Sequence, residues 1–161
     1  MRRSKLKVLL FLVVPVVAGL VQALASPPSS GQWPILDLPL VVVVLTATQY
    51  PSLGTIGFGW LAGLSQDLFT GELLGLNAFA KMVVALGVLF CLGWTEVKGF
   101  GFSLVMVVLS TFAEVLAGNL MAALGGRGTV PFWTASGHML LGNVLLFTVL
   151  YLMVRRRDGG K

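Results

Sequence analysis

Long apolar runs, separated by short breaks rich in proline, glycine and polar residues, constrain this chain more than any other feature of its sequence. Hydrophobic residues make up 57% of the chain and charged residues only 11%, whereas an ordinary soluble domain has about 25% charged residues. So few charges cannot cover a water-facing surface, and so many apolar residues are not found in a disordered chain. The sequence therefore predicts an integral membrane protein.

The apolar runs predict helices rather than strands. The run at 40–45 is rich in valine and would suggest a buried strand in a soluble protein. In lipid, an open strand leaves backbone groups without hydrogen bonds, so a helix is favoured. We therefore expect an all-α fold, a polytopic six-helix transmembrane bundle that forms one domain over residues 1–161. The expected spans cover residues 6–25, 36–50, 53–69, 78–95, 101–124 and 135–154.

The positions of the basic residues predict the orientation of the bundle. Cytoplasmic flanks of membrane proteins are enriched in lysine and arginine. Here both ends of the chain are basic, whereas the loops predicted on the opposite side contain a single basic residue, Arg127. We therefore expect both termini in the cytoplasm, and we attribute the net charge of +5 to topology rather than to a nucleic-acid partner. The basic end residues are Arg2, Arg3, Lys5, Lys7, Arg155, Arg156, Arg157 and Lys161.

The first apolar run has two possible fates. Its basic start, its apolar centre and the sequence Ala23-Leu24-Ala25 before Ser26 also fit a cleaved signal peptide. The run is, however, about 20 residues long, which is the length of a membrane-spanning helix. We expect a retained helix, and cleavage is the alternative.

No set of residues in the sequence indicates catalysis or metal binding. The chain has one histidine, His138, and one cysteine, Cys91, which lie far apart in the sequence. Neither a metal site nor a disulfide follows from them. The sequence also contains no phosphate-binding loop and no zinc-protease motif. We expect a protein that is not an enzyme and that uses no cofactor or metal.

Ionisable residues inside the predicted spans are the strongest candidates for a specific role, because charge near the bilayer centre costs about 2.5–3.5 kcal/mol. Asp37 begins the second span and is expected near the headgroups. Lys81 lies about one turn into the fourth span, and two interpretations are equally favoured. It either pairs with Asp67 near the end of the third span or extends to the outer headgroups.

Glu114 lies near the middle of the fifth span, where its side chain cannot reach the headgroups. Asn143 in the sixth span is expected at a similar depth, and Asn119 lies about one turn beyond Glu114. We favour a structural role, in which Glu114 and Asn143 join two helices by a hydrogen bond. The alternative is that Glu114 marks a path for a substrate or for protons.

The segment that joins the third and fourth spans carries the most specific pattern. Gly71 and Gly75 allow the positive φ with which a helix often ends, and Asn77 is suited to cap the helix that follows. Asp67 and Thr70 are expected to bond backbone groups at the turn. We therefore expect a tight helix hairpin here.

The third span itself is rich in small residues. The sequence Gly59-x-x-x-Gly63 places two glycines on one face of this helix. Such a face allows another helix to approach closely. We expect the neighbour to be a helix of the same chain, and a partner protein is the alternative.

In the hairpin segment the chain resembles the MreD family of bacterial rod shape-determining membrane proteins. After a glycine-rich helix, the family carries glycines that correspond to Gly63, Gly71 and Gly75, an aspartate that corresponds to Asp67, and a histidine or asparagine that corresponds to Asn77. The resemblance implies a non-catalytic scaffold of the peptidoglycan synthesis complex for cell elongation. It also implies binding to MreC and, through it, to MreB, RodA and a class B penicillin-binding transpeptidase.

The same resemblance implies a location in the bacterial inner membrane and a fold like that of the substrate-binding subunits of energy-coupling-factor transporters. A second functional hypothesis follows from this fold, namely a subunit of a membrane transporter that binds a small, vitamin-like molecule. It predicts an outward-facing cavity lined by polar groups, whereas a scaffold needs none. The candidate lining residues are Asp67, Lys81, Glu114, Asn119 and Asn143.

Overall fold

The computed structural model of the chain describes residues 2–25, 36–70, 74–95, 99–124 and 132–158. These ranges contain no strand, and the all-α prediction is confirmed. Each helix begins and ends within four residues of its predicted bounds. The helices are α1 (Arg2–Ala25), α2 (Leu38–Gln49), α3 (Gly54–Thr70), α4 (Leu76–Trp94), α5 (Phe100–Leu124) and α6 (Phe132–Asp158).

Among the described helices, three are long and apolar enough to cross a membrane. Their spanning ranges are Leu76–Trp94 in α4, Phe100–Leu120 in α5 and Ser136–Arg156 in α6. Helix α2 has only 12 residues, or about 18 Å at 1.5 Å per residue. It is therefore shorter than a hydrocarbon core of about 30 Å. A bundle in which all six helices cross the bilayer remains a prediction.

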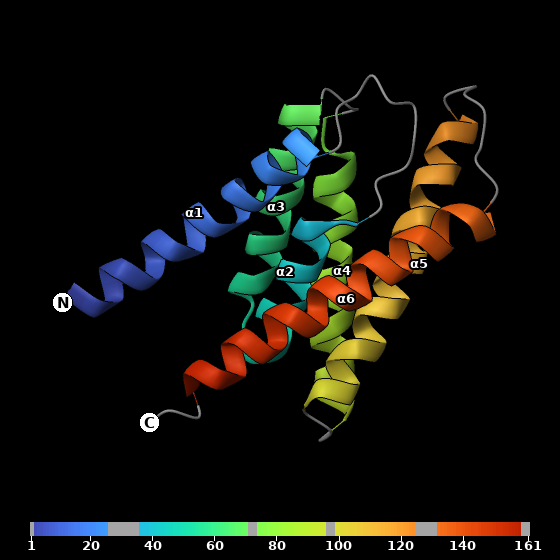
Figure 1. Cartoon of the computed structure of the whole chain (residues 1–161). Helices are drawn as coiled ribbons and strands as arrows, with labels where there is room; N and C mark the ends of the chain where they lie inside the picture. Colours follow the sequence, from blue (N-terminus) through green and yellow to red (C-terminus); the bar gives the residue numbers. More distant parts are fainter. Residues whose placement is uncertain (1, 26–35, 71–73, 96–98, 125–131, 159–161) are drawn as a thin grey trace.

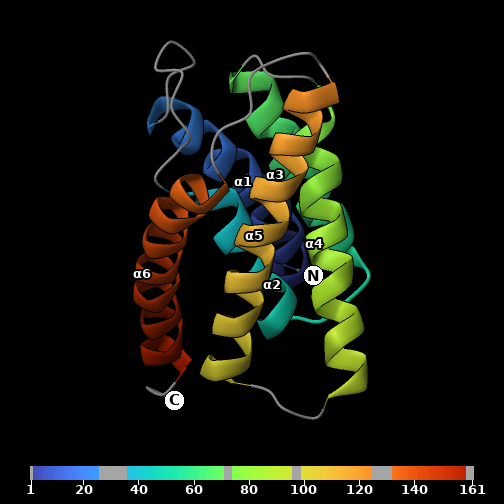
Figure 2. The same ribbon diagram turned by 90° about the vertical axis from the view of Figure 1, so that its right-hand side faces the viewer.

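The helices run alternately up and down, as Figures 1 and 2 show. Helices α3 and α4 pack against each other, as do α5 and α6, and α1 packs along α3. Helix α2 occupies the middle, because it contacts each of the other five helices. The short second helix is thus surrounded by protein.

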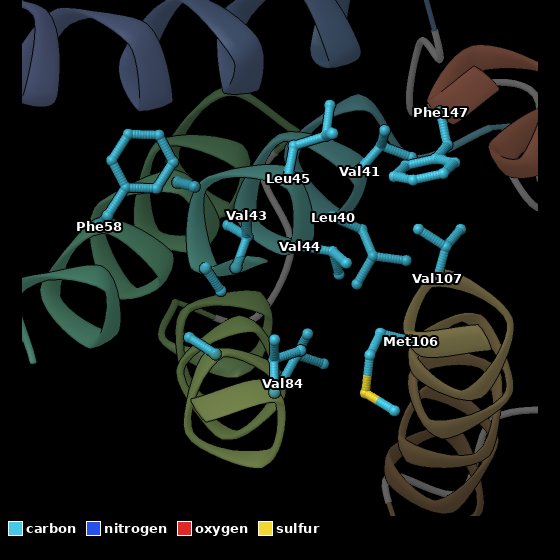
Figure 3. Packing of buried hydrophobic residues seen from close by; sticks show 14 residues of the cluster. Leu40, Val41, Val43, Val44, Leu45, Phe58, Val84, Met106, Val107 and Phe147 are labelled. Atoms are coloured by element: carbon cyan, nitrogen blue, oxygen red, sulfur yellow. The ribbon is translucent and has the colours of Figure 1, made fainter. Parts of the chain in front are cut away.

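The valine-rich run forms the centre of the core because α2 is apolar on every side. A helix of this kind is stable when other elements surround it. Leu40, Val41, Val43 and Val44 have no exposed surface. Their neighbours come from four other helices, and Figure 3 shows Phe58 of α3, Val84 of α4, Met106 and Val107 of α5, and Phe147 of α6.

Helices α3 and α4 approach closely because glycines of α3 face the backbone of α4. A Cβ atom at Gly59 would stand 2.6 Å from the carbonyl oxygen of Lys81, and a Cβ atom at Gly63 would collide with the backbone of Asn77 and Ala78. Real Cβ atoms do not approach backbone atoms so closely, so only glycine fits at these positions. The predicted close-packing face is confirmed, and its partner is a helix of the same chain.

Helix α1 packs into the bundle through polar side chains as well as apolar ones. The hydroxyl of Ser65 in α3 donates a hydrogen bond of 3.1 Å to the carbonyl oxygen of Pro15. Near the end of α1, Nε2 of Gln22 donates to the carbonyl oxygen of Leu36, at 2.8 Å, and Oε1 accepts from the backbone N–H of Leu38, at 3.0 Å. These bonds join α1 to both α3 and the start of α2.

Candidate functional site

The centre of the bundle holds three ionisable side chains in direct contact. Nζ of Lys81, in α4, donates to Oδ2 of Asp37 at 2.9 Å and to Oε1 of Glu114 at 2.6 Å. The Lys81 side chain has no exposed surface. We call Asp37, Lys81 and Glu114 the ion triad. Both interpretations of Lys81 drawn from the sequence are wrong, because it neither pairs with Asp67 nor extends out of the protein.

Asp37 is positioned by the start of α2, where it is the residue that caps the helix. Its Oδ1 accepts a hydrogen bond of 2.8 Å from the backbone N–H of Leu40, and Pro39 stands in the first turn, where a missing N–H costs nothing. The capping role fixes the side chain and turns Oδ2 toward Lys81. Asp37 is 1% exposed, so it is enclosed by the protein, where the sequence suggested the headgroup region.

Helix α6 joins the triad through an amide side chain. Oδ1 of Asn143 accepts a hydrogen bond of 2.6 Å from the backbone N–H of Asp37. Its Nδ2 donates to the hydroxyl of Thr111 in α5 at 2.9 Å, and this hydroxyl donates to the carbonyl oxygen of Val107. Asn143 and Thr111 are fully buried. The direct bond expected between Glu114 and Asn143 is wrong, since Asn143 instead reaches the triad through Asp37.

The triad and the Asn143–Thr111 pair form one polar network across four helices. The start of α2, α4, α5 and α6 each contribute a side chain to it. Buried polar groups stabilise a fold only when they are bonded to one another. Here nearly every polar group is bonded within the protein, so the network can hold the four helices in one arrangement.

A second polar cluster lies at the turn between α3 and α4. Asp67 accepts hydrogen bonds from three backbone N–H groups at the start of α4: Gly75 at 2.8 Å, Asn77 at 3.1 Å and Ala78 at 3.3 Å. A negative charge is favoured at the amino end of a helix, where these N–H groups lack partners within the helix. Asp67 thus caps α4 from the end of α3.

The cap of α4 differs from the predicted one. Gly75 stands at the capping position with φ +98° and no side-chain bond, so the predicted positive φ is confirmed. Asn77 lies in the first turn of the helix, and its backbone N–H donates a hydrogen bond to Oδ1 of Asp67. The hydroxyl of Thr70 donates to the carbonyl oxygen of Gln66, as expected for a residue at a helix end. Gly71 lies outside the described residues.

The predicted site residues therefore divide into two groups. Gly63, Asp67, Gly75 and Asn77 come together at the turn between α3 and α4. Lys81, Glu114 and Asn143 come together in the polar network, whereas Asn119 is half-buried further along α5. Sequence reasoning missed Thr111, which lies about one turn before Glu114 on α5. Its spacing of three residues from Glu114, which places both side chains on one face of α5, was the local signal that could have found it.

The described residues contain no group of three or more histidine, cysteine, aspartate and glutamate side chains that could hold a metal ion. No family model, curated protein or solved structure matches this chain. What the polar network and the α3–α4 turn do has to be inferred from their own chemistry.

Proposed function

We propose that the chain is a non-catalytic membrane scaffold of the peptidoglycan synthesis complex for cell elongation, and that it helps to maintain a rod cell shape. The proposal rests on the resemblance of the α3–α4 segment to the MreD family. It places the chain in the bacterial inner membrane with six spans and both termini in the cytoplasm. Its partner is MreC, which connects it with MreB, RodA and a class B penicillin-binding transpeptidase.

The observation that carries the proposal is the way in which the intramembrane polar groups are used. Lys81 bonds to two carboxylates, and Asn143 bonds to α2 and α5. These groups connect helices with one another. A channel or an enzyme needs polar groups that face a substrate, whereas a scaffold needs a fixed outer surface. A network that fixes the helices favours the scaffold.

The residues that resemble the MreD pattern also have structural uses. Gly63 allows α3 to touch the backbone of α4, Asp67 caps α4, and Gly75 adopts positive φ at the turn. None of these uses involves a reacting group. A sequence pattern that specifies a rigid helix hairpin is suited to a protein whose function is to present a surface.

The transporter-subunit hypothesis is less well supported. It needs Asp67, Lys81, Glu114 and Asn143 to converge on one ligand. Asp67 instead binds the start of α4, and Lys81 and Asn143 bind other residues of the network. Most of the groups that would recognise a polar ligand are already occupied by bonds within the chain.

Co-purification from membranes tests the proposal. The tagged full-length chain is co-expressed with the MreC protein of the same organism, extracted in mild detergent and analysed by native mass spectrometry. We expect a complex with MreC and no retained small hydrophilic ligand. The absence of MreC, or a bound vitamin-like molecule, would contradict the scaffold function and favour the transporter subunit.

A matched pair of glycine variants connects that test with the α3–α4 segment. Gly63→Leu introduces a side chain where a Cβ already collides with α4, whereas a Cβ at Gly57 on the same helix meets nothing within 4 Å. We expect Gly57→Leu to retain MreC and Gly63→Leu to lose it. Equal retention by both variants would show that the hairpin geometry is not needed for the complex.

A further inference from the structure

The ion triad contains two carboxyl groups but only one ammonium group. If all three side chains are ionised, the triad carries a net charge of −1 inside the bundle. Of the four carboxyl oxygens, three accept hydrogen bonds: Oδ1 of Asp37 from Leu40, and Oδ2 of Asp37 and Oε1 of Glu114 from Lys81. The fourth oxygen, Oε2 of Glu114, is buried and has no hydrogen-bond partner among the described residues.

The two carboxyl groups are held by the same ammonium nitrogen, because Nζ of Lys81 lies 2.9 Å from Oδ2 of Asp37 and 2.6 Å from Oε1 of Glu114. An ionised carboxylate can only accept a hydrogen bond, because it has no hydrogen to donate. Two ionised carboxylates in contact would repel each other and share no bond. This repulsion is removed if one of the two is a carboxylic acid.

Among the residues that the structure describes, Lys81 is the one cation that pairs with Glu114. The charged groups that act on it are Asp37, ahead of α2, and Lys81 in α4. From α6 the network receives Asn143, which is a neutral amide and is bonded to Asp37 and Thr111. An uncompensated charge inside a protein is unfavourable. One added proton makes the triad neutral and gives Oε2 of Glu114 a hydrogen.

We propose that the ion triad is a proton-binding site, in which one proton from water is bound to Oε2 of Glu114 while the carboxylate of Asp37 keeps its charge. One O–H bond forms at Glu114 as hydronium gives up its proton and becomes water. No other bond breaks, and nothing is oxidised or reduced. Lys81 keeps its positive charge and bonds to both side chains, and the net charge of the triad changes from −1 to zero.

Infrared spectroscopy of the full-length protein in lipid nanodiscs at neutral pH tests the proposal. A carboxylic acid has a C=O absorption that is separate from the bands of carboxylates and amides and that shifts in heavy water. We expect such a band in the wild-type protein. It should shift when the glutamates carry ¹³C at the side-chain carboxyl and should not shift when the aspartates do. The labels need no substitution, so this test does not depend on the folding of a variant.

Substitutions show which of the three glutamates of the chain gives the carboxylic acid band. Glu72 and Glu96 are the other two. The band should keep its full intensity in the Glu72→Gln/Glu96→Gln double variant and disappear in Glu114→Gln. The proposal is overturned if the wild-type protein has no carboxylic acid band at neutral pH. It is also overturned if the band follows the aspartate label, or if the band disappears in the double variant.

Discussion

Gly59 of α3 lies directly against the backbone of Lys81 in α4, since a Cβ atom at Gly59 would stand 2.6 Å from the carbonyl oxygen of Lys81. The backbone of Lys81 is therefore in close contact with α3, and its side chain carries the central ammonium group. The helix packing and the ion triad meet at one position. A change in the glycine face of α3 should accordingly disturb the triad as well as the hairpin.

Alanine substitutions along α3 test whether its glycine face packs closely against α4. Gly63→Ala is expected to lower the free energy of unfolding by about 1–3 kcal/mol, the usual cost of overpacking. Gly57→Ala meets no neighbour within 4 Å and should leave stability unchanged or raise it, because alanine favours helices. The midpoint of heat-induced loss of helical circular dichroism in detergent measures both. Equal midpoints for the two variants would contradict the packing described here.

Removal of the central cation is expected to be costly. Lys81→Met leaves Asp37 and Glu114 facing each other without their shared partner, and loss of one member of a buried ion pair typically costs about 3–5 kcal/mol. The matched control is the triple variant Asp37→Asn/Lys81→Met/Glu114→Gln, which has no charge in the triad. Thermal unfolding should show the single variant as the least stable of the three proteins. A triple variant no more stable than Lys81→Met would contradict an electrostatic cause.

Glu114 should tolerate a neutral isostere and reject an apolar residue. The amide of Glu114→Gln can accept from Lys81 through its oxygen and donate through its nitrogen, so we expect stability and MreC retention close to wild type. Glu114→Leu can do neither and should lose about 2 kcal/mol or more, as buried polar partners are left without bonds. Unfolding midpoints and co-purification yields measure the difference. A similar loss in both variants would indicate that the negative charge itself is required.

Because Asp67 caps α4, its replacement should have a local effect at the start of that helix. In Asp67→Ala the N–H groups of Gly75, Asn77 and Ala78 lose their acceptor. Loss of a helix cap typically costs about 0.5–2 kcal/mol. Hydrogen–deuterium exchange should rise at the start of α4 and remain unchanged at the start of α2, where Asp37 is the cap. Unchanged protection at Gly75 to Ala78 would exclude the capping role.

The contacts of α1 predict that the first helix stays in the mature protein. Gly19 packs against the side chain of Ser65. The side chain of Gln22 bonds to the backbone of Leu36 and Leu38 at the start of α2. Loss of this helix would expose these polar groups of the bundle. We expect the intact mass of protein purified from membranes to include the residues of α1. A mature amino terminus at or near Ser26 would support the signal-peptide alternative instead.

Much of the fold could be predicted from local features of the sequence. Apolar runs set the helices, and two glycines spaced by one helical turn set the α3–α4 contact. The valine-rich run was predicted to be helical, as α2 is, and α2 is buried because it is apolar on every side. These are properties of a single helix and of its immediate neighbour along the chain, which periodicity and residue type describe well.

The partners of Lys81 could not be predicted in the same way. They lie 44 and 33 positions away in the sequence, at Asp37 and Glu114. Depth in a bilayer suggests Asp67 as the nearest carboxylate, but depth says nothing about which helices are neighbours around the bundle. The capping of α4 shows a similar limit, because Asp67 reaches its N–H groups from the previous helix and takes the role expected of Asn77.

The central place of α2 has a consequence for how the chain is made. Asp37 is bonded through its backbone to Asn143, 106 positions later. During synthesis the second helix is therefore in place long before its last neighbour leaves the ribosome. Until α6 is added, the nascent bundle is open on one side, and the backbone N–H of Asp37 lacks its acceptor. A chain cut short before α6 should be recognised as incomplete and degraded by membrane proteases.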